Sequence, residues 1–264
     1  MWAWWLMVGF AVFLIGVTKS GFGAGVGLMI VPMTVIALRH LPPGAGAALG
    51  LMLPLLIAGD VIAVWQYRKL FNRQAVLRLL PGTCLGLIIG GGLLLHFHSQ
   101  TPQRLTAFIE IEIGLESILL VGLHWYRTWR ADVELLFQPN PMRSAAVGTF
   151  AGASSTLAHA AGPIIALHLL PQRFERQIFV GTCAVYFFIV NTAKVPVYVK
   201  GHQFRPDLLT TTIYLLPLVF AGAGFGYWLT RQLNEKVFSK IVYALTFCLG
   251  WYLVWLGVNA FSFL

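Results

Sequence analysis

A sequence pattern that recurs at a spacing of 131 residues constrains the fold of this chain more than any other feature. The aligned pairs are Gly21 and Gly152, Pro32 and Pro163, Gly50 and Gly181, Asp60 and Asn191, Tyr67 and Tyr198, and Lys69 and Lys200. The register continues without a gap for about 50 residues. An internal repeat of this kind predicts two halves built from the same series of structural elements.

Continuous apolar runs indicate the class of protein. The 264 residues are 58% hydrophobic and only 10% charged, whereas a soluble domain carries roughly 25% charged residues. The runs reach the ~20 residues that a helix needs to cross a bilayer, and they do not alternate as strands would. We therefore expect an all-α integral membrane protein.

The distribution of charged residues and of cysteines argues against several other kinds of partner and site. The net charge of +9 comes from Lys and Arg residues that stand one to four at a time in short loops, as in membrane proteins in contact with anionic lipids. This distribution gives no reason to expect nucleic acid. Cys84, Cys183 and Cys248 lie in apolar runs without a CxxC motif, so we expect no disulfide, metal site or cofactor. The apolar first segment has no basic start or clear cleavage site, which favours a retained membrane element over a signal peptide.

Eight membrane elements are expected, four in each half. They cover residues 3–38, 43–66, 74–97 and 103–124, then 143–170, 174–198, 206–230 and 236–260. The corresponding organisation is a first repeat over 1–125, a cytoplasmic linker over 126–142 and a second repeat over 143–264.

The positions of Lys and Arg favour one of two topologies. If all eight elements cross the membrane, the basic loop residues divide 9 against 7 between its two sides. If the first element of each half enters the membrane and turns back, they divide 12 against 4, with Arg39, Arg104, Lys200 and Arg205 outside. Because cytoplasmic loops carry most Lys and Arg, the re-entrant arrangement is preferred. It leaves three spans in each half, so the second half is predicted to be inverted relative to the first.

Both halves open with a small-residue break in an apolar stretch, TKSGFGAGVG at 18–27 and GASSTLAHAAGP at 152–163. Irregular backbone at membrane depth occurs where it is buried in protein or lines a cavity, and paired breaks mark midplane binding sites in transporters. Free amides at half-helix starts bind anions. The candidate substrate ligands here are Gly23, Gly25, Gly27, Ser154, Ser155, Thr156 and His159. The alternative is that the glycines only allow close helix packing.

Charged residues within the apolar elements are further candidates, because charge at membrane depth is costly. Lys19 adjoins the first break and Lys194 lies in the sequence NTAKVP; either could neutralise an anion or extend to a lipid headgroup. Asp60 and its repeat partner Asn191 lie deep in equivalent helices, and Asn191 is a further candidate substrate ligand. Asp60 could carry a proton, or form an ion pair with Lys19 or Lys194 that only fixes packing.

Three glutamates, Glu110, Glu112 and Glu116, fall within the fourth element. Glu112 and Glu116 are four residues apart and share a helix face. With Asp60 they are candidates for proton coupling. The alternative is a polar helix face directed toward the interior of the bundle or the headgroups.

The motifs resemble those of a known family. GFGAGVGLMIVP, followed by PPGAGAALGLML and later by GTCAVYFFIVNTAKVPVY, is similar to the TauE/SafE sulfite exporter-like permeases over essentially the whole chain. The resemblance implies transport of small sulfur-containing anions such as sulfite or sulfonates, often outward. Ala24 and Val26 depart from the family's run of glycines, and the three glutamates replace residues expected to be apolar.

Together these observations predict a secondary transporter in a bacterial inner membrane, working by alternating access and coupled to protons. An uptake permease, a passive channel, and an intramembrane hydrolase using Ser154 or Ser155 with His159 are alternatives. No GxxxxGK[ST] loop is present, so a primary pump is not expected without a partner chain. The sequence leaves the oligomeric state open.

Overall fold

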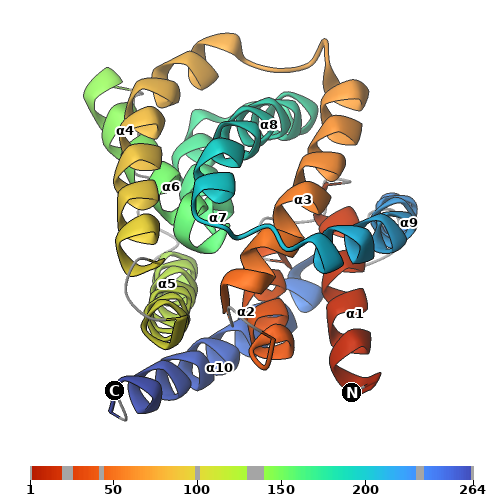
Figure 1. Ribbon diagram of the computed structural model, residues 1–264. Helices are drawn as coiled ribbons and strands as arrows, with labels where there is room; N and C mark the ends of the chain where they lie inside the picture. The colour runs from red at the N-terminus through yellow and green to blue at the C-terminus, as the bar shows by residue number, and fades with distance from the viewer. Residues whose placement is uncertain are drawn as a thin grey trace.

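The computed structural model describes residues 2–19, 26–41, 45–98, 102–129, 140–229 and 235–262, and these form a helical bundle without strands (Figure 1). The first half contains α1 (Trp2–Lys19), α2 (Val26–Leu38), α3 (Ala45–Tyr67), α4 (Arg73–His98) and α5 (Pro102–Trp129). The second half contains α6 (Pro141–Ala158), α7 (Ala161–Leu169), η1 (Leu170–Gln172), α8 (Arg176–Lys200), α9 (Pro206–Leu229) and α10 (Glu235–Ser262).

Five of the described helices are long and apolar enough to cross a membrane: α3, α4, α8, α9 and α10. α5 has the length but carries Glu110, Glu112 and Glu116. The helices of the two broken elements are shorter, with 18 and 13 residues in α1 and α2 and 18 and 9 in α6 and α7. The chain is therefore a multi-pass membrane protein, and the all-α expectation is confirmed.

The four most extensive helix pairs each combine one helix from each half. α4 packs on α6, α5 on α10, α1 on α9, and α3 on α8. Glycines allow the closest approaches: a Cβ added to Gly82 would lie 1.8 Å from the carbonyl oxygen of Ala145, and one added to Gly148 would lie 2.2 Å from that of Leu79. Small residues bring helix backbones together in this way in membrane proteins. The two halves are consequently interlocked.

The first two helices of each half fold back on one another. The rings of Trp4 and His40 lie 6.3 Å apart, which places the start of α1 beside the end of α2. Ser144 Oγ lies 3.2 Å from His168 Nε2, which places the start of α6 beside the end of α7. The second break lies at His159 and Ala160, between α6 and α7, with His159 in the left-handed conformation (φ 52°). The first break falls on residues 20–25, which lie outside the described residues.

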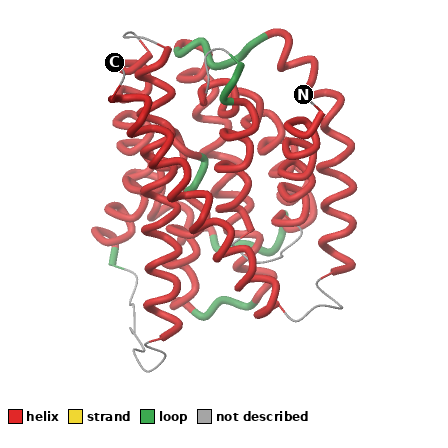
Figure 2. The backbone as a smooth tube through the Cα atoms, turned by 90° about the horizontal axis from the view of Figure 1, so that it is seen from below, coloured by secondary structure: helices red, strands yellow, loops and turns green. Residues whose placement is uncertain are grey.

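α3 and α8, which are equivalent in the repeat, run antiparallel. A Cβ on Gly50 would lie 1.9 Å from the Gln203 carbonyl oxygen, and one on Gly181 would lie 2.0 Å from that of Leu70. The start of each helix thus lies beside the end of the other. The start of α1 and the end of α10 lie toward the same end of the bundle (Figure 2).

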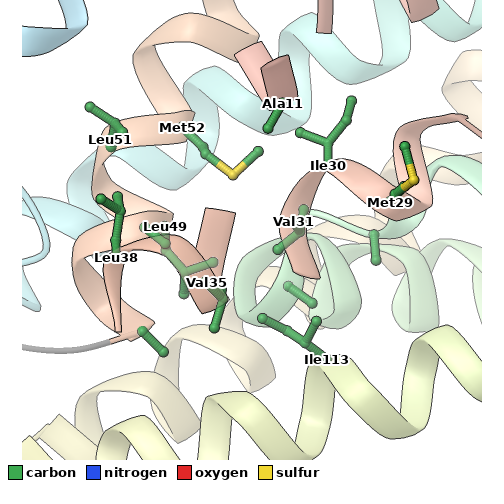
Figure 3. Close-up of a cluster of buried hydrophobic side chains, with 14 of the residues drawn as sticks. Ala11, Met29, Ile30, Val31, Val35, Leu38, Leu49, Leu51, Met52 and Ile113 are labelled. Atoms are coloured by element: carbon green, nitrogen blue, oxygen red, sulfur yellow. The ribbon is translucent and has the colours of Figure 1, made fainter. Parts of the chain in front are cut away.

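The main hydrophobic core surrounds α2 and α3. Val35, Leu49, Met52 and Ile113 are among its buried members, and Figure 3 shows them converging from three helices. The core fixes the backbone of α3, which brings the Leu49 carbonyl to the second break.

Candidate functional site

Asp60 lies at the crossing of α3 and α8, fully buried. Lys19 Nζ, from the end of α1, donates to one carboxylate oxygen. Asn191 Nδ2 donates to the other at 2.6 Å. Asp60 therefore contacts its own repeat partner. The sequence left open whether Lys19 or Lys194 pairs with Asp60, and in the structure the partner is Lys19.

Lys194, one helical turn beyond Asn191 on α8, is also fully buried. Its ammonium donates to the carbonyl oxygen of Ser155 at 2.8 Å, to Ser155 Oγ at 3.0 Å and to His159 Nδ1 at 2.8 Å. His159 Nε2 lies 3.1 Å from the carbonyl oxygen of Leu49. A carbonyl only accepts, so the ring proton belongs on Nε2, and Nδ1 accepts from the lysine.

We call Lys19, Asp60, Ser155, His159, Asn191 and Lys194 the central cluster. The three donors of Lys194 are satisfied by neutral acceptors, and Asp60 is paired with Lys19. The central cluster thus has two lysines and one carboxylate. Charges at membrane depth need compensation, and an anion beside the two lysines would supply it.

A second polar group lies where α5 meets the end of α6. Ser154 donates to Glu116, and Glu112 lies one helical turn before Glu116 on the same face of α5. The Oε2 atom of each glutamate is buried and has no hydrogen-bond partner within the described part of the chain.

A cavity of about 1010 Å³ reaches the central cluster. Lys19, Ser155, His159 and Asn191 lie in its wall. So do Ala160 and Gly162 at the start of α7, a helix whose N-cap residue makes no side-chain hydrogen bond to it. The first amides of a helix have no partner within the helix and carry its positive dipole end. Amides, a hydroxyl and an ammonium group together can bind a small anion.

The other predicted site residues lie elsewhere. Ser154 contacts Glu116, while the Thr156 hydroxyl donates to the Gly152 carbonyl of its own helix at 2.9 Å. Glu110 is buried separately and accepts from Arg39 Nε at 2.5 Å. Gly23 and Gly25 lie outside the described residues, and Gly27 falls in the first turn of α2. Lys194 lies behind the cavity wall and supports Ser155 and His159 from there.

Sequence reasoning did not single out Tyr198 as a site residue. Its hydroxyl donates to the carbonyl oxygen of Thr156 at 2.7 Å and lies 3.4 Å from His159 Nε2, so it holds the end of α6 from α8. The repeat contained a signal, because Tyr67 aligns with Tyr198. No such signal in the sequence pointed to Phe187, whose ring lies 5.2 Å from Lys19 Nζ.

The hydrolase alternative receives no support from this arrangement. His159 contacts Lys194 through Nδ1 and Leu49 through Nε2. Ser154 donates its hydroxyl to Glu116. A serine nucleophile needs an imidazole nitrogen within hydrogen-bond reach to accept its proton.

Comparisons with known proteins agree with this architecture. The profile of the family described as sulfite exporter TauE/SafE matches residues 8–253, nearly the whole chain. No curated protein and no solved structure gave a significant match. The profile spans both repeats and every residue of the central cluster, and the chain therefore belongs to the sulfite exporter TauE/SafE family, whose members are membrane anion exporters.

Proposed function

We propose that this protein is a secondary transporter of a bacterial inner membrane that exports small sulfur-containing anions, such as sulfite or organosulfonates, by alternating access. The observation that carries the proposal is the buried central cluster, in which two lysines and one carboxylate meet beside a large cavity. An anion that binds at this site balances its positive charge.

The anion is held where the cavity meets the central cluster. Lys19 supplies positive charge, and Asn191 and Ser155 supply hydrogen-bond donors. His159 lies in the same wall, where its Nε2 proton is donated to the Leu49 carbonyl oxygen, and the amides at the start of α7 add further donors. Lys194 keeps Ser155 and His159 in position and adds its own charge from behind.

The relation between the two halves supports alternating access. Equivalent helices α3 and α8 run antiparallel, and Asp60 contacts its counterpart Asn191 at their crossing. This is the arrangement expected for repeats inverted about an axis in the membrane plane, an axis that passes through the site. The folded-back pairs α1–α2 and α6–α7 act as the re-entrant elements, and movement of one half against the other exposes the site to each side in turn.

Proton coupling follows from competition for Lys19. An anion that binds the Lys19 ammonium displaces the Asp60 carboxylate, which is then buried without its cation, a costly arrangement unless it takes up a proton. A sulfite dianion that leaves with one proton still carries negative charge outward, which an inside-negative membrane potential favours. Glu112 and Glu116, joined to the end of α6 through Ser154, provide a second place for a proton.

Counterflow of labelled sulfite in proteoliposomes tests the proposal. We expect saturable exchange for the wild-type protein and a loss of roughly tenfold or more in apparent affinity for Lys194→Ala, because hydrogen bonds to a charged group contribute about 1.5–3 kcal/mol. Lys200→Ala, an exposed lysine at the end of the same helix, is the matched control and should behave as wild type. Absence of sulfite and sulfonate exchange by folded protein would contradict the proposal.

A further inference from the structure

A second, smaller cavity also reaches the central cluster. It has a volume of about 350 Å³ and lies between α1, α3 and α9, three helices that pack on one another (Figure 1). The large cavity, in contrast, is walled in part by α5, α7, α8 and α10. Of the residues that the structure describes, only Lys19 lines both cavities. Lys19 is therefore the point at which the two cavities meet.

The smaller cavity extends from the level of Asp60 toward the ends of α3 and α9. Gly59 lies in its wall, next to Asp60 in the chain, and Gln66 lies two helical turns further on, roughly 10 Å away along the axis. Gln66 and Gly224, near the end of α9, are exposed, which places the opening there. The large cavity reaches Arg176 at the start of α8, beside the end of α3. Both cavities therefore lead from the central cluster toward the same side of the bundle.

The wall of the smaller cavity suits water better than an anion. Among its described residues, Lys19 is the only ionisable one and Gln66 is the only other residue with a polar side chain. Gly16, Gly59 and Gly224 add no side chains that would fill the space. The volume of about 350 Å³ is far above the ~10–15 Å³ that one water molecule needs. Water can thus extend from the opening to the Lys19 ammonium.

Asp60 is accessible to this water only through its partner. Its side chain is fully buried and lines neither cavity, whereas the side chain of Lys19 is 17% exposed. Lys19 donates to one oxygen of the carboxylate. Asn191 donates to the other, but its amide does not take up protons. The hydrogen bond from Lys19 is therefore the link between Asp60 and the smaller cavity.

The other titratable groups around this ion pair lie away from the smaller cavity. Lys194 and His159 hydrogen-bond to each other, and Lys194 lies behind the wall of the large cavity. His159 and Cys183 line the large cavity. Protons that enter through the smaller cavity consequently meet Lys19 first.

We propose that protons reach Asp60 through the smaller cavity, separately from the anion, which uses the large one. The Lys19 ammonium gives a proton to the Asp60 carboxylate along their hydrogen bond, and the resulting amine takes a proton from hydronium in the cavity, which becomes water. The net result is a neutral Asp60 and an ammonium group that is free to bind the anion. The inference rests on the proposed function, because it assigns a route to the proton of the same site.

Filling the smaller cavity tests the inference. A Cβ added to Gly224 would meet nothing within 4 Å, so Gly224→Phe brings a ring to the cavity without a clash at the helix backbone. Labelled methanesulfonate is followed in proteoliposomes by counterflow at equal pH, which needs no net proton movement, and by the initial rate of uptake driven by a pH gradient. We expect wild-type counterflow and a roughly tenfold or greater loss in the driven rate, because the ring displaces the water that carries the proton.

Three further substitutions assign the effect to this cavity. Gln66→Leu makes its opening apolar and should also slow driven uptake while counterflow stays at the wild-type rate. Gly92→Phe, at an exposed glycine of α4 where an added Cβ also meets nothing within 4 Å, should match wild type in both measurements. Gly162→Leu adds its side chain in the large cavity and should slow both together. The ratio of the two rates in one preparation is insensitive to partial loss of folded protein.

The outcomes separate this inference from the proposed function. If Gly224→Phe and Gln66→Leu keep both rates at the wild-type value, the inference is overturned and the anion carrier stands. It is also overturned if counterflow falls together with driven uptake in Gly224→Phe but not in Gly92→Phe, because the smaller cavity then belongs to the anion path. Wild-type counterflow without any driven uptake overturns proton coupling and the inference with it. Absence of methanesulfonate and sulfite exchange by folded wild-type protein overturns the proposed function itself.

Discussion

Asp60 lies beside the place where we propose that the anion binds. Its carboxylate accepts hydrogen bonds from Lys19 and from Asn191, and both of these residues also lie in the cavity wall. We propose that a carboxylate in this place competes with an anionic substrate and determines whether a proton accompanies it. Asparagine keeps the size and the acceptor oxygen of the side chain but can neither carry the charge nor titrate.

We predict that Asp60→Asn retains anion exchange and loses proton coupling. Methanesulfonate, which does not titrate near neutral pH, is the probe in proteoliposomes with an imposed pH gradient. Wild-type protein that moves one proton per anion accumulates it on the alkaline side up to about tenfold per pH unit, since one unit is 1.36 kcal/mol. Asp60→Asn should exchange methanesulfonate without accumulating it. Asp207→Asn, an exposed aspartate paired with Arg205 at the start of α9, is the control; accumulation by Asp60→Asn would place the coupling elsewhere.

The sequence singled out the residues of the central cluster. It did not determine which of them contact one another. The repeat register aligned Asp60 with Asn191, and helices that cross antiparallel at equivalent positions bring such a pair into contact. The choice of Lys19 over Lys194 as the partner of Asp60 depends on where α1 ends relative to α3, which periodicity does not contain. Likewise, three adjacent hydroxyls at 154–156 looked equivalent, but successive helical residues point in different directions.

At the scale of helices, the second break lies at a different position from the one that the sequence signal indicated. The run of small residues at 152–163 predicted a break, yet Gly152 lies inside α6, where an added Cβ would be 2.5 Å from the Thr83 carbonyl oxygen of α4. The helix ends later, at Ala158, and His159 caps it. A glycine permits both a turn and a close helix contact, so its presence alone does not distinguish them.

The contact of α4 with α6 should therefore be sensitive to a single methyl group. Gly82→Ala places a Cβ within 1.8 Å of the Ala145 carbonyl oxygen, so the helices must separate, and we expect a loss of about 1–3 kcal/mol or more in unfolding free energy. Gly92→Ala on the same helix meets nothing within 4 Å and should be neutral or slightly stabilising. Thermal unfolding of the two purified variants measures the difference; equal melting temperatures would show that this close approach is unimportant.

For the whole molecule, the helix pairs explain why the two halves work as one unit. The four most extensive pairs join the two repeats: α1 with α9, α6 with α4, α3 with α8 and α5 with α10. In the first two pairs, the opening helix of one half packs on the helix that corresponds to the third element of the other. A two-fold relation between the repeats produces this reciprocal exchange, and it means that one half cannot move without changing its contacts with the other.

Lys69 and Lys200 provide a direct test of the inversion, because they are exposed and occupy equivalent positions in the repeat. In a protein from which Cys84, Cys183 and Cys248 have been removed, Lys69→Cys and Lys200→Cys are labelled with a membrane-impermeant maleimide in intact cells and in inverted vesicles. With α6 and α7 re-entrant, three spans (α4, α5 and α8) separate the two positions, so we expect Lys200→Cys to react in cells and Lys69→Cys only in inverted vesicles. If the broken element crosses the membrane instead, four spans separate them and both cysteines react from the same side. That result would replace the inverted repeat by a parallel one, and the axis through Asp60 and Asn191 would no longer relate an inward-open to an outward-open state.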